Sequence, residues 1–298
     1  MVVHNANSIQ RNSGSKVFDI INIAITSFFG LLCLLPFLNV FALSMSSGRA
    51  IMSGDVSFFP VEIQFNAYAA VFKNSAMMAS FKFTALLTLV YTAVSILMTI
   101  CAAYPLTKKG LKGKRCILIL IIFTMYFNAG IIPNYIVVKN LGLIDKMWSL
   151  IFPGMISAYN LILLRTFFLS IPESLIEAAY LDGCSEVRTL ITIVLPLSKP
   201  VLATLCLFYA VGRWNGFQDA LYYINTPDLY PLQLKLREII VQDRMAEIGA
   251  QEGGLMSNLV AESVKSASIM FATIPILMLY PWLQKYFISG IMIGAVKE

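Results

Sequence analysis

Residues 177–196 run Glu177-Ala-Ala-Tyr-Leu-Asp-Gly183, then nine residues, then Ile193-Val-Leu-Pro196. This polar, helix-forming segment lies between two strongly apolar stretches of the chain. Its position predicts a loop between two membrane-crossing helices. Such a loop can serve as a handle through which a protein outside the bilayer moves helices inside it.

The composition of the whole chain is that of a membrane protein. Of the 298 residues, 58% are hydrophobic and 13% are charged, with a mean hydropathy of +0.76. Soluble domains are typically about 45–50% apolar and about 25% charged. A soluble chain would have nowhere to bury this much apolar surface.

Six apolar windows predict an all-α integral membrane protein with six transmembrane helices. Each reaches the roughly 18–20 residues that cross the hydrocarbon core as a helix. The weakest contains Lys199 and Arg213 near its two ends, where charge costs less. We expect the first to be retained, because it is longer than the apolar region of a signal peptide. The windows are residues 20–48, 83–107, 116–138, 147–164, 198–217 and 266–284.

Charge distribution predicts the orientation. With the N-terminus in the cytoplasm, the inner segments hold 12 of the 22 basic and 6 of the 16 acidic residues, a net charge of +6 inside and 0 outside. Loop 108–115 alone carries five basic residues, as the positive-inside rule requires. We therefore expect cytoplasmic tails at 1–16 and 291–298, a six-helix domain over 17–290, a cytoplasmic loop at 169–197 and an outer loop of short helices and turns at 218–265.

Several kinds of chemistry lack the residues they need. The one histidine, His4, lies in the polar tail, so neither a catalytic triad nor a histidine metal site is predicted. The five cysteines form no C-x-x-C pair, and we expect them to be small buried side chains. No nucleic-acid-binding motif occurs. No Walker A pattern occurs either, so the sequence offers no phosphate-binding loop of that kind.

The 169–197 loop has helix-start and helix-stop signals. Ser170 and Glu173 have capping-box spacing, which predicts a helix over 172–182 that ends at Gly183. Ser185 is placed to cap a second helix, so the glycine becomes an elbow. From the residues alone, the first helix is either a docking handle or an amphipathic helix lying on the membrane surface.

This loop resembles the EAA loop of ABC-importer permeases, whose pattern is EAA, three residues, G, nine residues, I-x-L-P. Cys184 stands where that family more often has Ala. Leu141-Gly-Leu143, Trp214-Asn215 and the 290–297 tail are similar to maltose-type sugar permeases, and Asn66-Ala-Tyr68 to their oligosaccharide branch. The residues that match the EAA pattern are Glu177, Ala178, Ala179, Asp182, Gly183, Ile193, Leu195 and Pro196.

The resemblance implies a type I ABC importer permease fold in a bacterial plasma (inner) membrane. It implies a helix over 173–185 that docks on a cytoplasmic ATPase. Its implied partners are a second, related permease, two ATPases that hold ATP and Mg²⁺, and an extracytoplasmic solute-binding protein. The implied cargo is carbohydrate, expected to be an oligosaccharide, and the chain itself would bind no cofactor.

Polar residues within the apolar windows are candidates for the substrate pathway. Sugars are commonly held by aromatic faces and amide hydrogen bonds; the alternative role is hydrogen bonding between helices. A permease for a non-sugar solute stays open, whereas absent mid-membrane carboxylates disfavour an ion-coupled transporter or an intramembrane enzyme. The candidates are Tyr126, Asn128, Tyr159, Asn160, Trp214 and Asn215, with Asn134 and Arg213 nearby.

Overall fold

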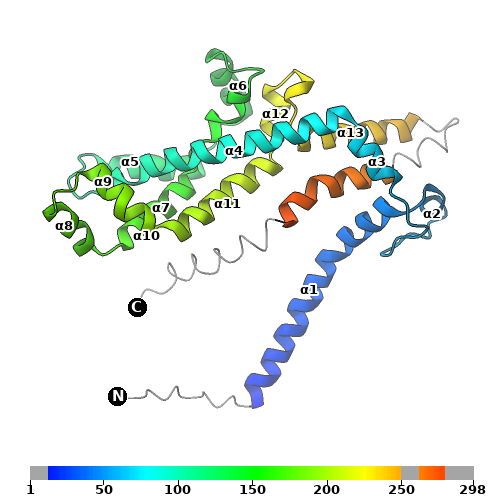
Figure 1. Cartoon of the computed structure of the whole chain (residues 1–298), viewed down its shortest axis with the longest axis horizontal. Coiled ribbons are helices and arrows are strands. Elements are labelled where there is room, and N and C mark those ends of the chain that lie inside the picture. Colours follow the sequence, from blue (N-terminus) through cyan, green and yellow to red (C-terminus); the bar gives the residue numbers. More distant parts are fainter. Residues whose placement is uncertain (1–12, 250–261, 279–298) are drawn as a thin grey trace. The chain divides into compact units, whose positions relative to one another are not determined.

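The computed structural model describes residues 13–249 and 262–278, and every regular element within those ranges is helical. The chain divides into two compact units, residues 1–71 with 246–270 and residues 72–245 with 271–298. The first unit contains α1 (Ser13–Met45), α2 (Gly48–Met52) and most of α3 (Asn66–Lys73) (Figure 1).

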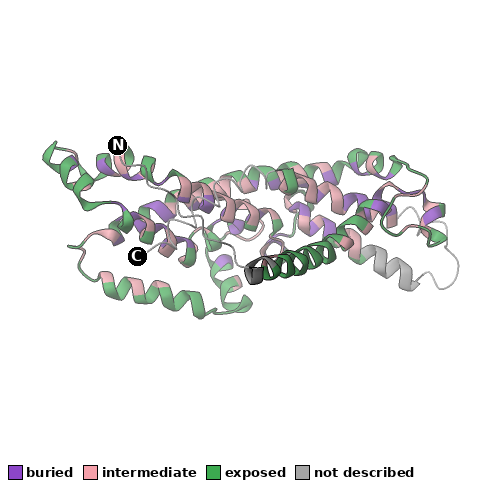
Figure 2. Ribbon diagram, turned by 90° about the horizontal axis from the view of Figure 1, so that it is seen from below, coloured by how far each residue is buried: buried purple, intermediate pink, exposed green. Residues whose placement is uncertain are grey.

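Helix α1 confirms the first apolar window as a helix. Its stretch Val17–Met45 has 29 residues and a mean hydropathy of 2.2, and at 1.5 Å per residue it is long enough to cross a bilayer. Large apolar side chains along it are exposed, for example Phe18 at 68% and Leu31 at 63%. Figure 2 colours most of this helix as exposed. Within its own unit this helix packs little, so its apolar side chains are available to contact lipid or other helices.

The second unit is organised around α4 (Ser75–Ala103), α7 (Ala158–Ser170) and α11 (Lys199–Asn215). Leu161, Leu164 and Leu205 belong to one buried apolar cluster, and Leu87 and Ile151 belong to another. The remaining helices are α5 (Lys114–Tyr126), α6 (Ile131–Asn140), α8 (Glu173–Leu181), α9 (Glu186–Thr189), α10 (Leu195–Leu197), α12 (Gln218–Tyr223) and α13 (Leu232–Gly249).

Two windows that hydropathy predicts as continuous helices are broken, so those predictions are wrong. Window 116–138 divides into α5 and α6, which are bent by 118°. The turn is local: Asn128 Oδ1 accepts from Gly130 N at 2.9 Å, and Gly130 has a φ of +90°. Window 147–164 begins with two 3₁₀ turns, Met147–Leu150 and Phe152–Gly154, and bends by 52° before α7.

The other windows follow the prediction more closely. Helix α4 begins eight residues before window 83–107 and ends four residues before that window does. Helix α11 begins one residue after the start of window 198–217 and ends two residues before its end. Of the last window, residues 266–278 are helical, and the predicted part 279–284 lies outside the described residues, as does the 291–298 tail. Within the described ranges, two helices can cross a membrane alone, or up to five spans exist if each bent pair counts as one.

Two smaller expectations also meet the structure. The 218–265 loop contains α12, a 3₁₀ turn at Pro227–Leu229 and α13, while residues 250–261 lie outside the described part. The expectation of buried cysteines is wrong, because Cys33, Cys101 and Cys116 are exposed and the other two are half-buried. In a membrane helix an apolar side chain can face lipid, so hydrophobicity does not imply burial inside the protein.

Candidate functional site

The EAA segment forms the predicted helix–glycine–helix elbow. Helix α8 ends in a Schellman motif, in which Gly183 N donates to Tyr180 O at 3.0 Å and Cys184 N donates to Ala179 O at 2.9 Å. Gly183 has a φ of +78°, a left-handed conformation that favours glycine. Ser185 Oγ accepts from Arg188 N at 3.4 Å and so caps α9, as predicted.

The start of α8 differs from the prediction. The Ser170–Glu173 capping box is wrong, because α7 continues as far as Ser170 and its hydroxyl donates to Phe167 O at 2.7 Å. Pro172 occupies the N-cap position of α8 without a side-chain hydrogen bond. Glu173 instead forms an ion pair with Lys109, with 2.7 Å between Oε1 and Nζ.

The I-x-L-P half of the pattern attaches the elbow to the helical core. After α9 the chain makes a π turn, Leu190–Val194, in which Leu195 N donates to Leu190 O. This wider turn precedes Pro196, which has no N–H to donate to the helix. Val194 is fully buried in the same cluster as Leu205 of α11, while Ile193 and Leu195 are half-buried.

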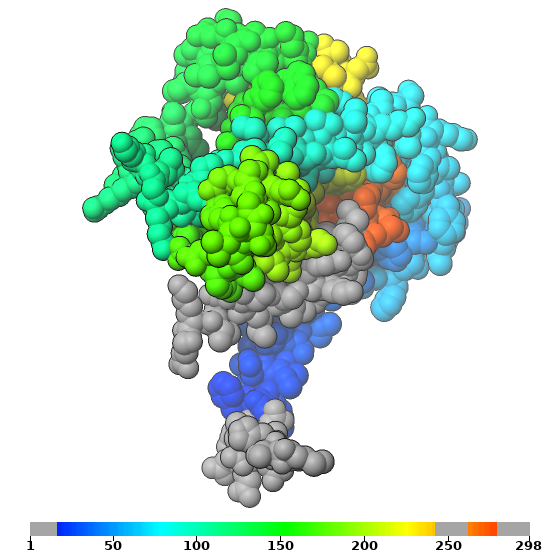
Figure 3. All heavy atoms as spheres, turned by 60° about the vertical axis from the view of Figure 1, so that its left-hand side comes forward, coloured from blue at the N-terminus to red at the C-terminus, as the bar shows by residue number. Residues whose placement is uncertain are grey.

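The EAA half is exposed by contrast. Only Ala179 of α8 is buried, whereas Glu177, Ala178 and Asp182 are exposed. Leu181 is 90% exposed and Leu175 is 44% exposed. In Figure 3 the green to yellow-green surface, which includes the elbow segment, faces the viewer and is not covered by other parts of the chain in this view. An exposed helix with apolar side chains and two carboxylates is suited to docking on another protein.

A polar cluster, here called the polar joint, ties this elbow to the end of α4. The joint consists of Tyr104, Lys108, Tyr180 and Glu186. Lys108 Nζ lies 2.5 Å from Glu186 Oε2 and donates to the Tyr180 hydroxyl at 2.6 Å. Tyr104 donates to Glu186 Oε2 at 2.9 Å, and Lys108 Nζ lies 4.5 Å from the centre of its ring.

The charges of the joint stabilise each other. Burial acts to lower the pKa of Lys108, but its hydrogen bonds to Glu186, Tyr180 and Tyr104 outweigh burial and raise that pKa above its usual value. Burial acts to raise the pKa of Glu186, and hydrogen bonds from Lys108, Tyr180 and Tyr104 outweigh it and lower that pKa. Both groups are therefore charged throughout the physiological pH range.

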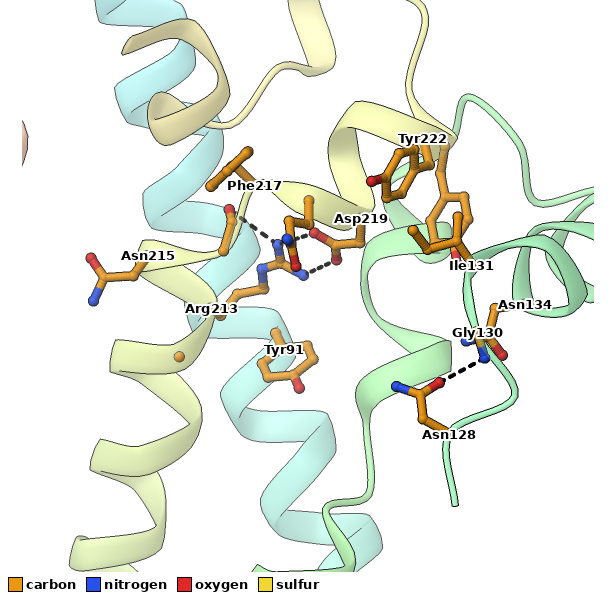
Figure 4. A pocket seen from close by; sticks show the side chains of 14 residues that line it. Tyr91, Asn128, Gly130, Ile131, Asn134, Arg213, Asn215, Phe217, Asp219 and Tyr222 are labelled. Atoms are coloured by element: carbon orange, nitrogen blue, oxygen red, sulfur yellow. Dashed lines mark hydrogen bonds and ion pairs between the residues drawn. The ribbon is translucent and has the colours of Figure 1, made fainter. Parts of the chain in front are cut away.

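A cavity of about 470 Å³ lies toward the other end of α4 and α11 (Figure 4). Its wall is formed by α4, the break between α5 and α6, the end of α11, and α12. Most of the polar groups that line it are uncharged amides and phenols, which suit neutral hydroxyl groups. They are Tyr91, Asn128, Asn134, Asn215, Gln218, Tyr222 and Tyr223.

The two charged residues that line this cavity neutralise each other. Arg213 is 6% exposed, and its two terminal nitrogens lie 2.5 and 2.9 Å from the carboxylate oxygens of Asp219. Its guanidinium also donates to Leu150 O at 2.9 Å and to Gly216 O at 3.3 Å. Four of its five N–H groups are thus engaged, which makes Arg213 a clasp that joins α11 to α12 and the 147–150 turn.

The predicted pathway residues have different surroundings. Asn128 and Asn215 line this cavity. Tyr159 and Asn160 line a second hollow of about 460 Å³, which shares Tyr91 and Gly212 with the first.

The other two predicted residues line neither cavity. Tyr126 is 85% exposed. Trp214 donates to Ala272 O at 3.1 Å and its ring packs edge-on against Phe81. The structure therefore gives Trp214 a packing role.

Sequence reasoning missed the joint and the clasp. Lys108 and Glu186 are 78 residues apart, and the 108–115 loop already had an explanation in the positive-inside rule. Tyr91 lay unnoticed in an apolar window. The available signal was Arg213, a charged residue in a largely apolar window, because such a charge demands a partner.

Known proteins resemble the chain along nearly its whole length. The family model described as "Binding-protein-dependent transport system inner membrane component" matches residues 95–293. Protein LplC of Bacillus subtilis is 41% identical over 97% of this chain and 98% of its own length. The polygalacturonan/rhamnogalacturonan transport system permease protein YtcP of the same organism is 38% identical over 95% of this chain and 99% of its own length.

A solved structure extends the likeness to three dimensions. It is a chain from a bacterial ABC transporter involved in the import of the acidic polysaccharide alginate, and it is 34% identical to this chain. The alignment has a TM-score of 0.83 and covers 93% of this chain and 98% of that one.

Proposed function

The chain belongs to the family of binding-protein-dependent transport system inner membrane components, and from this premise we propose that it is the permease subunit of an ATP-driven importer of carbohydrate. It is a transport subunit, not an enzyme. It would form half of the translocation pathway, with its α8–Gly183–α9 elbow docked on a separate ATPase. The observation that carries this proposal is the complete EAA pattern, whose EAA half lies on the exposed helix α8 and whose I-x-L-P half is anchored to the bundle beside the buried Val194.

Oligosaccharide is the cargo that the site supports best. The similar permease YtcP is named for polygalacturonan and rhamnogalacturonan transport, and the similar solved structure comes from an alginate importer. A cavity lined by amides and phenols fits this cargo, because sugar hydroxyls both donate and accept hydrogen bonds. We propose Tyr91, Asn128, Asn134 and Asn215 as groups that contact a passing sugar.

We propose a six-span topology with both termini in the cytoplasm. The spans would be α1, α4, the bent pair α5–α6, the turns of 147–154 with α7, α11, and a last helix that begins within 262–278. The net charge of +6 on the inner segments supports this orientation. It puts the elbow and the 108–115 loop in the cytoplasm and the Arg213 clasp toward the outer side of a bacterial plasma membrane.

The proposed partners come from the family to which the chain belongs and from the phosphate-binding loop that its sequence lacks. ATP, with Mg²⁺, would bind to two ATPase subunits, because this chain has no phosphate-binding loop. A second permease of the same family would complete the pathway, and an extracytoplasmic binding protein would deliver the sugar. When ATP closes the ATPase pair, the docked elbows would move with it. ATP shifts the inward–outward equilibrium only through contacts that differ between the two states.

The proposal is tested by side chains added at Gly183. An added Cβ there meets no non-neighbouring atom of the described residues within 4 Å, so a side chain at this position starts in open space. We expect Gly183→Asn and Gly183→Asp to insert in the membrane but to lose the ATPase during purification. Gly142→Asn is the matched control, because Gly142 also has a positive φ, of +65°, and open space around it, but lies in the proposed outer loop.

Asparagine and aspartate tolerate left-handed backbone better than other residues with a side chain, so strain in the three variants is similar. ATPase retained in full by both Gly183 variants would contradict docking at the elbow. Equal loss in Gly142→Asn would show that backbone strain, not docking, is responsible.

A further inference from the structure

We infer that the polar joint of Tyr104, Lys108, Tyr180 and Glu186 is the link that carries movement of the docking helix α8 into α4 and so to the cavity wall. These would be positioning residues that determine how much uptake each ATP drives. The inference rests on the proposed function, because it assumes that an ATPase moves α8.

The first step concerns how α8 is held. Among the described elements, α8 packs little against any other helix, and its main neighbour is α9, which follows it across the Gly183 elbow. Its one buried side chain is that of Ala179. Two side-chain contacts connect α8 to the segment that follows α4: Tyr180 bonds Lys108, and Glu173 pairs with Lys109.

The second step concerns the rigidity of the elbow. Lys108 contacts Tyr180 on α8 and Glu186 on α9 at the same time, with 2.6 Å and 2.5 Å from its Nζ. One ammonium group thus spans both arms of the elbow on either side of Gly183. As long as these contacts persist, the two arms and the end of α4 move as one body.

The third step leads from the joint to the cavity. Tyr104 is buried, and its ring lies 6.3 Å from that of Phe168 in the core cluster. The chain runs from Tyr104 back along α4 without a break to Tyr91, which lines both hollows. Thirteen residues of helix span about 20 Å. Figure 1 shows α8 and α9 at one end of the α4–α11 pair.

The neighbouring ion pair shows what distinguishes the joint. Lys109 and Glu173 are also in contact, but their side chains are 84% and 61% exposed. Exposed pairs contribute little, because water screens them and both side chains stay mobile. The Lys108 side chain is only 28% exposed and three partners hold it, whereas the Glu186 side chain is 57% exposed, close to the 61% of Glu173. The joint therefore differs from the neighbouring pair in its half-buried Lys108 ammonium group, which three side chains bond at once.

The test is a charge exchange measured on the purified complex with its ATPase, its partner permease and the binding protein. We expect Lys108→Glu and Glu186→Lys each to keep the ATPase bound while lowering sugar uptake per ATP by about fivefold or more, a typical coupling magnitude. The double variant Lys108→Glu with Glu186→Lys restores the opposite charges, so uptake per ATP should recover. Lys112→Glu, the same charge reversal at an exposed residue of the same loop, is the matched control.

Three outcomes would overturn the inference: single reversals that leave uptake per ATP unchanged, a double variant that assembles but does not recover, or an equal loss in Lys112→Glu. Tyr180→Phe gives a milder check if a reversal fails to assemble, because it removes only the hydroxyl that Lys108 bonds. It should lower uptake per ATP without releasing the ATPase, and an unchanged ratio would count against the joint. Retention of the ATPase reports separately on the proposed docking, so the two ideas can fail independently.

Discussion

Removal of the Asp219 carboxylate would leave the buried Arg213 guanidinium without its counter-charge. Two carbonyl oxygens, those of Leu150 and Gly216, would remain as acceptors. Breaking a buried ion pair from one side costs about 3–5 kcal/mol. Because the Asp219 side chain is 32% exposed and water can replace part of it, we expect Asp219→Ala to destabilise the protein by about 3 kcal/mol, the lower end of that range.

Thermal unfolding of the detergent-purified complex measures this loss. At about 2–4 °C per kcal/mol for a chain of this size class, Tm should fall by about 6–12 °C. Asp219→Asn keeps one acceptor oxygen and should cause a smaller fall. The double variant Arg213→Met with Asp219→Ala also removes the stranded charge, so its Tm should lie closer to that of the wild type than the Tm of Asp219→Ala does.

A Tm for Asp219→Ala within 2 °C of the wild type, taken here as about 1 kcal/mol or less, would refute the clasp. A double variant less stable than Asp219→Ala would also refute the stranded-charge argument, because the loss would then come from packing of the Arg213 side chain.

Three further predictions concern single residues near the cavity and in the loops proposed to face the outside. Gly216→Ala should cost about 1–3 kcal/mol in unfolding free energy, because its Cβ would lie 2.8 Å from Arg213 Nη2 and 3.2 Å from Gly212 O, whereas Gly212→Ala meets open space and should be near neutral. Asn128→Ala and Asn215→Ala should each lower sugar uptake by about two- to tenfold, which corresponds to the free energy of one hydrogen bond, while the complex retains its ATPase. Undiminished uptake in both variants would show that these side chains do not contact the sugar. Asp145 accepts hydrogen bonds from Thr226 Oγ1, Thr226 N and Asn225 N, the first of which contributes most to holding its pKa below the ordinary value. The contact between Asp145 and the 225–226 segment should therefore be complete above about pH 4 and should be lost only as the pH falls through that lowered pKa. Hydrogen exchange of the Asn225 and Thr226 amides, compared with a reference amide, measures this contact. In the wild type these amides should lose protection only at low pH, whereas in Asp145→Ala they should be unprotected at every pH.

Local signals predicted the elbow well. Its signals act between residues that are close in sequence: Gly183 ends α8 and Ser185 caps α9. Both partners of each interaction therefore appear within the same short stretch of sequence, as they also do in the apolar window of α11. The break at Asn128–Gly130 was missed because hydropathy averages over about 20 residues, whereas a single amide hydrogen bond and one positive φ make the turn. The capping box failed because the preceding helix extended to include Ser170.

Long-range polar contacts could not be predicted from one sequence. Lys108 and Glu186 meet only because α4 and α7 place their ends together through buried residues such as Tyr104 and Phe168. Arg213 and Asp219 are six residues apart, a spacing that does not put them on one helix face, and they meet because the chain turns at Gly216. Counting charges explained Lys108 as part of the positive-inside pattern, so its contacts with Glu186 and Tyr180 were not predicted.

Docking of α8 on an ATPase is tested most directly by photo-cross-linking from Leu181, which is 90% exposed at the end of that helix. A benzophenone amino acid at position 181 should form an adduct with the ATPase in intact membranes. The same amino acid at Phe59, which is 81% exposed in the proposed outer segment, should form none. No ATPase adduct from position 181, or an equal yield from position 59, would contradict the account.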